Sequence, residues 1–249
     1  MQIEGRNPVI EALRAKKELT KIFLEKDINV DEKIDEIIRL AKRADIPILY
    51  RPKKLLGRIS QTGVHQGVIA KRNEDVQTMN MNALIDAIDS TKKDPFLVYV
   101  REALYEHNLG AVIRTCECAG ADAVLIPPKL TITSQVVRAS MGATEHIKII
   151  NESLFNAIKI AKKNAIKVIG IEVSGKKFYY ENDLTGRVML IIGGEDHPLS
   201  EEITNQCDLV VKIPLHGRVN SLNMSVAASI VIYDKIRQEY QSKIQEHDS

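Results

Sequence analysis

The feature that most restricts the fold of this 249-residue chain is a series of apolar runs from residue 96 onward. Phe96 to Val100, Ala123 to Ile126 and Val188 to Ile192 carry no charged residue and show no alternation of polar and apolar positions. A strand with one face in water alternates, whereas a strand buried on both faces is continuously apolar. Segments with helical spacing separate the runs. Residues 95–249 are therefore predicted to form an α/β domain whose parallel sheet is covered by helices on both faces.

The first 72 residues repeat the alternation of strands and helices on a smaller scale. We expect helices over Ile3–Ala15, from Asp31 onward and over Lys53–Ile59, and strands at Lys21–Glu25, Ile46–Tyr50 and Gly67–Lys71. This length suits a small domain. Residues 73–94 are predicted to be a linker that includes one helix with an apolar face. The chain is thus expected to have two domains, over 1–72 and 95–249.

The charge of the chain is unevenly distributed. Residues 1–75 hold 16 Lys+Arg and 12 Asp+Glu, a net +4, whereas the whole chain has a net charge of +2. The remaining residues therefore carry a net −2. A modestly basic N-terminal part is compatible with binding to nucleic acid, although ordinary solvated surface would look the same.

Composition and cysteine count indicate a soluble protein of a reducing compartment. The hydrophobic fraction is 44% and the charged fraction 27%, both ordinary for globular proteins. No apolar run approaches the roughly 20 residues that span a bilayer, and the N-terminus has no signal-peptide core. The three cysteines are Cys116, Cys118 and Cys207. This odd number favours the cytoplasm. Cys116 and Cys118 cannot share one helix face, so no metal site is expected.

Two segments in the C-terminal third are the best candidates for a binding site. The first follows an apolar strand and reads Gly193-Gly194-Glu195, and glycine lets a ligand approach the main chain closely. The second runs from Ile213 to Ser225 and brings Asn220, Ser221 and Asn223 to the start of an apolar helix. Backbone groups, amides and one carboxylate would suit a polar ligand.

A third segment, Asn108 to Gly120, follows the strand at Phe96–Val100. Asn108 is a suitable helix cap, and Gly110 permits close packing of the first helical turn. Arg114 could reach toward the carboxyl edge of the sheet, where ligands of open α/β sheets bind. Taken alone, the segment is equally compatible with Arg114 as a surface residue.

Together, Asn108…Arg114, Gly193-Gly194-Glu195 and Ser221-Leu222-Asn223 resemble the three ordered motifs of the SpoU/TrmH family. These proteins are RNA ribose 2′-O-methyltransferases of the SPOUT superfamily. The resemblance covers about 95–240 and includes Arg138 to Glu145. Gly5 to Leu13 and Gly63 to Gly67 resemble the substrate-binding domain of the bacterial 23S rRNA guanosine 2′-O-methyltransferase subfamily.

The resemblance implies a trefoil knot in the C-terminal domain, a rare exception to the rule that chains do not thread loops. It also implies an N-terminal RNA-binding domain like ribosomal protein L30e, S-adenosylmethionine as cofactor, an RNA substrate and a homodimer. Cofactor contacts would fall on Gly193, Gly194, Ile213 and Leu222. Catalysis would depend on the residues Arg114, Asn108, Glu195, Ser221 and Asn223.

Physical chemistry limits the role of the arginine. A guanidinium is always protonated, so Arg114 is expected to stabilise a developing alkoxide and a phosphate rather than act as a base. The other polar residues also have structural interpretations. Glu195 and Asn223 could cap local structure, Ser225 is expected to bond within its helix, and His65 is expected to close a turn.

The chain departs from the family pattern at two places. Tyr105-Glu106-His107-Asn108 replaces the usual Asp-Pro-x-Asn, and Asp196 and Pro198 replace glycines. There are three alternatives to rRNA methylation. They are a tRNA ribose methyltransferase, an RNA-binding homologue with impaired catalysis, which the departures favour, and a Rossmann enzyme. The last is disfavoured, because no Gly-x-Gly-x-x-Gly turn follows the first strand of the large domain.

Overall fold

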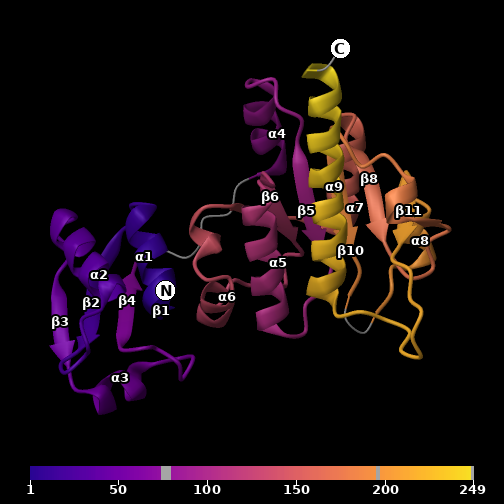
Figure 1. Cartoon of the computed structure of the whole chain (residues 1–249). Coiled ribbons are helices and arrows are strands. Elements are labelled where there is room, and N and C mark those ends of the chain that lie inside the picture. Colours follow the sequence, from indigo (N-terminus) through magenta and orange to yellow (C-terminus); the bar gives the residue numbers. More distant parts are fainter. Residues whose placement is uncertain (74–79, 195–196, 248–249) are drawn as a thin grey trace. The chain divides into compact units, whose positions relative to one another are not determined.

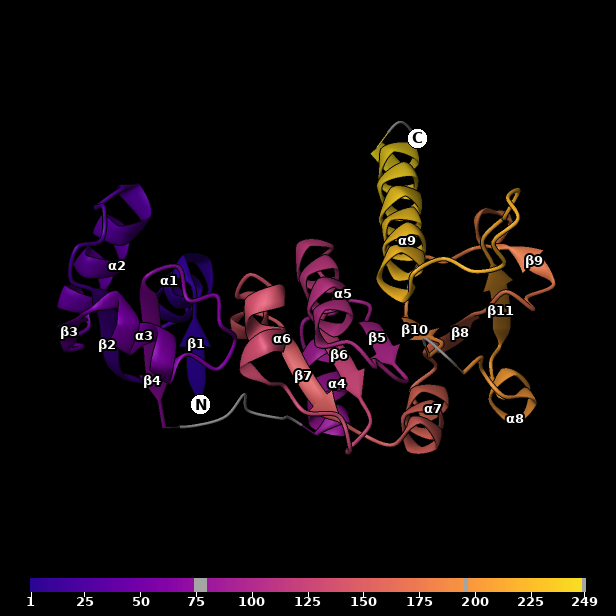
Figure 2. The ribbon, with the colours of Figure 1, turned by 90° about the horizontal axis from the view of Figure 1, so that it is seen from below.

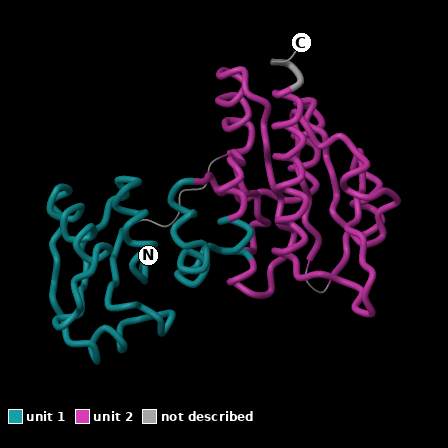
Figure 3. Tube along the Cα trace, in the orientation of Figure 1, with its two compact units in different colours: residues 1–77, 109–114, 131–146 teal, residues 78–108, 115–130, 147–249 magenta. Residues whose placement is uncertain are grey.

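The computed structural model describes residues 1–73, 80–194 and 197–247, and of 245–247 the backbone only. Figure 3 shows two compact units, which are considered separately below. Unit 1 contains the described part of 1–77 together with 109–114 and 131–146. Unit 2 contains the described parts of 78–108, 115–130 and 147–249.

Unit 1 is built on a four-stranded sheet with the order β1-β4-β2-β3. Strand β2 pairs with β3 in parallel and with β4 antiparallel, and β4 pairs antiparallel with β1. Helices α1 and α2 pack against each other (Figure 1). The elements are β1 (Gln2–Glu4), α1 (Arg6–Arg14), β2 (Leu19–Glu25), α2 (Glu32–Arg43), β3 (Ile48–Arg51), α3 (Lys53–Ile59) and β4 (Val68–Arg72).

Local sequence explains most of these boundaries. The Asp31 carboxylate accepts a hydrogen bond from the Ile34 amide at 3.1 Å and so caps α2, as expected. The expectation of a helix over Ile3–Ala15 was wrong at its start. Residues 2–4 form β1, and the positive φ of Gly5, 97°, turns the chain into α1.

The buried Glu4 side chain fixes the loop between α3 and β4. Its carboxylate accepts hydrogen bonds from the Ser60 hydroxyl at 2.6 Å, the Gln61 amide at 2.6 Å and the Thr62 hydroxyl at 2.5 Å. Gln2 donates a further hydrogen bond. Burial alone would raise the pKa of Glu4, but these hydrogen bonds outweigh it and the pKa is lowered.

Unit 1 also includes α6 (Ser134–Ala139) and the short 3-10 helix η1 (Ala143–Glu145). The Ser134 hydroxyl donates to the main-chain oxygen of Gln2 at 2.6 Å. Arg72 and Glu145 form an ion pair of 2.9 Å in which both side chains are buried. Because a buried charge is costly without its partner, this pair ties β4 to η1.

Unit 2 has a seven-stranded sheet of order β7-β6-β5-β10-β8-β11-β9, in which every recorded pairing is parallel. The parallel α/β domain predicted from the apolar runs is thereby confirmed. Its strands are β5 (Phe96–Val100), β6 (Ala123–Ile126), β7 (Lys148–Asn151), β8 (Lys167–Ile171), β9 (Lys177–Phe178), β10 (Val188–Ile192) and β11 (Leu209–Lys212). Strand β10 lies between two strands that precede it in the chain, β5 and β8. Threading of the chain into a knot stays a prediction.

Helices cover both faces of this sheet, as Figure 2 shows. One face is covered by α4 (Met81–Asp89), α7 (Leu154–Lys163) and α8 (Glu201–Thr204), whose apolar side chains share a core with the strands. The other face carries α5 (Glu106–Cys118) and α9 (Met224–His247), which the hydroxyls of Thr115 and Ser229 join at 3.1 Å. Helix α4 is the helix expected within 73–94, and its apolar residues belong to the core of unit 2.

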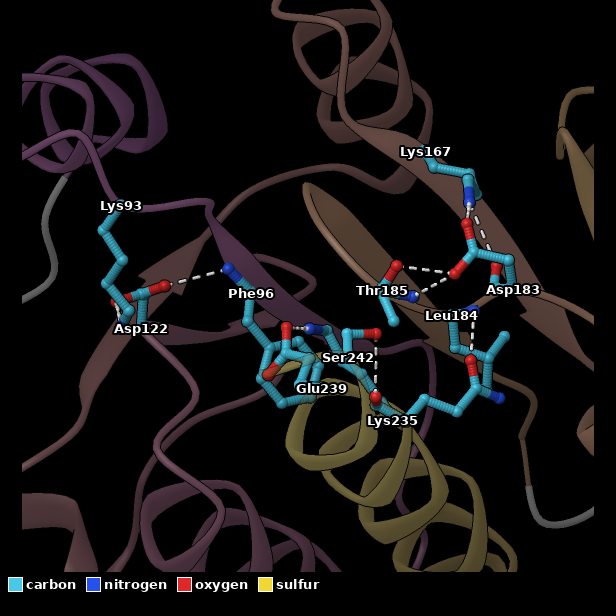
Figure 4. A network of polar contacts seen from close by, with 11 residues as sticks. Lys93, Phe96, Asp122, Lys167, Asp183, Leu184, Thr185, Lys235, Glu239 and Ser242 are labelled. Atoms are coloured by element: carbon cyan, nitrogen blue, oxygen red, sulfur yellow. Dashed lines mark hydrogen bonds and ion pairs between the residues drawn. The ribbon is translucent and has the colours of Figure 1, made fainter. Parts of the chain in front are cut away.

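The amino end of β5 is held by a network of polar contacts (Figure 4). The Asp122 carboxylate accepts from the Phe96 amide at 2.8 Å and from the Lys93 ammonium at 2.6 Å. On α9, Lys235 is 1% exposed, lies 4.6 Å from the centroid of the Phe96 ring and bonds to Glu239. These contacts hold α9 against the amino end of the sheet, away from the strands' carboxyl ends.

Candidate functional site

A cavity of about 780 Å³ opens at the carboxyl ends of β8, β10 and β11, within unit 2. This is the edge at which ligands of open α/β sheets bind, and the volume is typical of small-molecule sites. The loops that follow the three strands, the residues before and within the first turn of α5, and the start of α9 form its walls. It is lined by Tyr105, His107, Asn108, Ile171, Glu172, Val173, Ile192, Gly193, Gly194, Pro198, Ile213, Leu215, Asn220, Ser221, Leu222, Asn223, Met224 and Ala227.

Two asparagines from distant parts of the chain meet in this wall. The Asn223 side-chain amide donates to the Asn108 side-chain oxygen at 3.2 Å. The Asn223 side-chain oxygen accepts from the amide and hydroxyl of Ser225, at 2.9 and 2.6 Å. Asn223 thus caps α9 and lines the cavity at once. The local bonding expected of Ser225 is confirmed.

The Gly193-Gly194 segment is closely surrounded by carboxylates. A Cβ atom added to Gly194 would lie 2.2 Å from Glu102 Oε2 and 3.0 Å from the main-chain oxygen of His197. A Cβ atom added to Gly193 would lie 3.1 Å from Glu172 Oε2. A side chain at 194 would therefore displace the Glu102 carboxylate and crowd the main-chain oxygen of His197.

The residues around the departure at Pro198 are held from two sides. The Arg101 guanidinium donates to the main-chain oxygens of His197 and Pro198, at 2.9 and 2.8 Å. On the other side, Glu172 Oε2 accepts from the Leu199 amide at 2.8 Å. The segment 197–199, which follows β10, is thus held in place by Arg101, which follows β5, and by Glu172, which follows β8.

The cavity brings together most of the residues predicted from sequence. Asn108, Ser221 and Asn223 line it, as do the four predicted cofactor contacts, Gly193, Gly194, Ile213 and Leu222. Glu195 and Asp196 lie outside the described residues.

Among the predicted catalytic residues that the structure describes, Arg114 is not in the cavity lining. It is exposed on α5, and among the described residues none forms a recorded hydrogen bond or ion pair with it. Along the helix it lies six residues after Asn108, about 9 Å further along the axis and on another face. Its role stays a prediction.

The start of α5 required a correction. Asn108 was expected to cap the helix, but α5 begins at Glu106 and Tyr105 occupies the N-cap position. An acidic residue in the first turn favours this earlier start. Asn108 is consequently 5% exposed within the first turn, facing the cavity wall. The close packing expected at Gly110 is confirmed, since an added Cβ would lie 2.5 Å from that of Ala139.

Sequence reasoning missed Glu172 as a cavity residue. Its carboxylate accepts from the Val173 amide at 2.8 Å, in addition to its bond with Leu199. The available signal was its position directly after the apolar strand β8, beside the two strands already singled out. His65, in contrast, closes a turn as expected, because its Nδ1 accepts from the Gly67 amide at 3.0 Å.

Comparison with known proteins gives the class and the family. Residues 95–233 match the SpoU rRNA methylase family, and residues 2–75 match the family described as RNA 2′-O ribose methyltransferase substrate binding. YacO of Bacillus subtilis (strain 168), named as a TrmH family tRNA/rRNA methyltransferase, is 32% identical over 236 residues, which is 94% of each chain. The protein is thus an RNA methyltransferase. It belongs to the SpoU rRNA methylase family.

Two solved structures share the fold. SpoU methyltransferase AviRb from Streptomyces viridochromogenes, in complex with AdoMet, has a TM-score of 0.78 at 19% identity and covers 96% of this chain and 90% of its own. The A. aeolicus TrmH/SpoU tRNA modifying enzyme has a TM-score of 0.54 at 24% identity and covers 65% of this chain and 86% of its own. No helix among the described residues could span a membrane.

Proposed function

We propose that this protein transfers the methyl group of S-adenosylmethionine to a ribose 2′-hydroxyl of RNA, and that the acceptor is a guanosine of 23S rRNA. The observation that carries the proposal is the single cavity in which the second and third motif segments meet Asn108 of the first. Family membership gives the reaction class, and the acceptor is inferred from the resemblance of the N-terminal unit. We expect the protein to act in the cytoplasm.

The cavity suits the methyl donor chemically. Ile171, Ile192, Ile213, Leu215 and Leu222 offer apolar contacts, which an adenine ring would use. Asparagine, serine and glutamate side chains and free strand ends offer hydrogen bonds for a ribose and an amino-acid group. The AviRb structure, with the same fold, contains AdoMet. When bound, S-adenosylmethionine supplies a methyl group already activated by a positively charged sulfur.

The chain's own residues have the task of orienting the acceptor and stabilising charge. The bond between Asn108 and Asn223 fixes two neutral amides in the wall of the cavity, beside Ser221. Preorganised donors of this kind stabilise charge that develops on an attacking oxygen. Arg114 is proposed to stabilise the developing alkoxide and to bind a neighbouring phosphate, since its guanidinium stays protonated.

We propose that the protein forms a homodimer through exposed apolar side chains of helix α9. Helix α9 exposes Val226, Tyr233 and Tyr240, which are 47%, 49% and 68% exposed. Residues seven apart lie on one side of a helix, so these side chains form an apolar stripe. Ile232, on the same helix, is buried in the core of its own chain.

The N-terminal unit bears on which RNA is the acceptor. The tRNA modifying enzyme from A. aeolicus covers 65% of this chain, whereas AviRb covers 96%. The presence of a separate N-terminal substrate-binding unit favours rRNA, and tRNA is the alternative. The changes at Tyr105 and Pro198 favour a second alternative, an RNA-binding homologue with impaired catalysis.

Total RNA from a strain lacking this protein provides the direct test. The purified protein and labelled S-adenosylmethionine should methylate the 23S rRNA of that strain, and mass mapping should place the label on a guanosine ribose. Label in tRNA would select the tRNA alternative. No transfer, together with no binding of S-adenosylmethionine by calorimetry, would support the non-catalytic alternative.

A further inference from the structure

Two exposed rings, those of Tyr105 and His107, line the cavity. Both belong to the segment in which the chain departs from the family pattern. Their ring centroids are 5.7 Å apart, with planes tilted by 38°. Tyr105 is 60% exposed, and His107 is also exposed. Neither ring has a recorded hydrogen bond with a described residue, and neither belongs to the apolar core.

Capping of helix α5 does not explain why residue 105 is a tyrosine. The N-cap position favours Ser, Thr, Asp and Asn, whose side chains accept a hydrogen bond from the first helical turn. Tyr105 makes no such bond at the N-cap of α5. A large aromatic side chain thus occupies a position where it neither caps the helix nor fills the core.

From these observations we infer that Tyr105, with His107 beside it, forms a stacking platform for the base of the acceptor nucleotide. This inference rests on the proposed function and adds a residue that binds the base of the acceptor nucleotide. Aromatic rings bind unpaired bases through their faces, and each stacked base contributes about 5- to 150-fold in affinity. Such a contact tolerates different bases, because every base has a π-face.

The position of the rings supports the acceptor base over more distant ones. If a ribose presents its 2′-oxygen to the cavity while its base stays outside, the exposed rings of the cavity lining are in reach of that base. Because stacking needs an unpaired base, the platform predicts that the acceptor nucleotide is single-stranded or extruded from a helix when it binds.

The test uses the full-length protein, a short RNA that contains the mapped acceptor, and the same RNA with an abasic acceptor that retains its ribose. Tyr105→Leu should lower kcat/KM for the intact RNA by about 5- to 150-fold, chiefly through KM. Tyr105→Phe, which keeps the ring, should stay within about twofold of the wild type. Replacing the intact RNA by the abasic RNA should lower kcat/KM of the wild type by as much as the substitution Tyr105→Leu does. The same replacement should lower kcat/KM of Tyr105→Leu only slightly.

Thermal unfolding should be unchanged in both variants, and methyl transfer by the wild type separates this inference from the proposed function. Equal activity of Tyr105→Leu and wild type on intact RNA would overturn the platform. The platform would also be overturned if Tyr105→Leu lowered kcat/KM by the same factor on the intact and on the abasic RNA. A Tyr105→Leu variant that became monomeric would instead make the ring an interface residue. A wild type without methyl transfer would refute the proposed function itself.

Discussion

At the scale of single residues, the cavity combines structural and chemical duties in the same side chains. Asn223 caps α9 and also orients Asn108 in the cavity wall. Glu172 both lines the cavity and holds Leu199. Substitutions at such positions affect stability and activity together, so the most informative tests use residues with one duty only.

Arg114 has a proposed chemical role and no structural role among the described residues. Because it is exposed and without a recorded partner among the described residues, Arg114→Ala should leave thermal unfolding nearly unchanged. Methyl transfer should fall by about 100-fold or more, the usual loss when a group that stabilises developing charge is removed. Arg114→Lys keeps the charge but not the planar fork, so it should recover only part of the rate. Near-normal turnover of the alanine variant would remove Arg114 from the mechanism.

Gly194 offers a test of the cavity wall. The Cβ of Gly194→Ala would lie 3.0 Å from the His197 main-chain oxygen and far closer to Glu102, so the wall must shift. We expect binding of S-adenosylmethionine to weaken measurably by calorimetry and kcat/KM to fall by about 100-fold. Gly217→Ala is the matched control, because its Cβ would have no described atom within 4 Å. Equal behaviour of the two variants would contradict the prediction.

At the scale of elements, Glu4 shows how one side chain can hold a loop. Its lowered pKa means that folding favours the ionised form. The corresponding stability is present above the unfolded-state pKa of about 4.3 and is lost as pH falls through the lower folded-state value. Glu4→Gln should destabilise the protein by about 1.5–3 kcal/mol near neutral pH and flatten the acid side of its stability profile.

Denaturant unfolding between pH 3 and pH 7 would measure this effect. Glu18→Gln provides the control, because Glu18 is exposed in the same unit and its side chain has no recorded partner among the residues that the structure describes. If both variants retained the same acid dependence as the wild type, Glu4 would not be its source.

Helix α3 is the element of unit 1 best suited to RNA. Its exposed Lys53, Lys54 and Arg58 have no acidic residue among them and form no recorded ion pair with another described residue. Replacing all three with glutamine should weaken RNA binding and reduce the slope of log affinity against log salt by up to about 2–3. The exposed lysines of α7, Lys159, Lys162 and Lys163, make a matched control in unit 2. Filter binding at several salt concentrations would show an unchanged slope if α3 does not contact RNA.

The elements also show how far sequence reasoning reached. Strands β5, β6 and β10 begin and end at the predicted residues, because an apolar run buried on both faces is read without knowledge of its neighbours. Strands β1 and β9 were missed. They have three and two residues, and each exists through pairing with a strand far away in the sequence, β4 or β11.

The site was predictable for a similar reason, and only in part. Strand ends that carry glycines or amides revealed Gly193, Ser221 and Asn223 as cavity residues. Glu172 was not predicted, since a single glutamate after a strand has many structural uses. Arg114 was assigned to the site with Asn108 through the resemblance of the first motif segment. The cavity lining does not include it, and its role stays a prediction.

At the scale of the whole molecule, the proposed homodimer is testable in solution. Aspartates at Tyr233 and Tyr240 would place charges on the apolar stripe of α9, and the substituted protein should sediment as a monomer. The wild type should sediment at twice the chain mass of 27.9 kDa. Lys243→Asp, on the same helix, controls for added negative charge, and a monomeric wild type would refute the proposal.

The central place of β10 has a consequence for how the protein is made. Its neighbours β5 and β8 leave the ribosome first, and neither can complete its hydrogen bonding on that side until residues 188–192 have been synthesised. Until then the nascent chain lacks the strand that joins β5 to β8. Distant pairings of this kind slow folding, so we expect chaperone dependence during translation to end only after β10 has emerged.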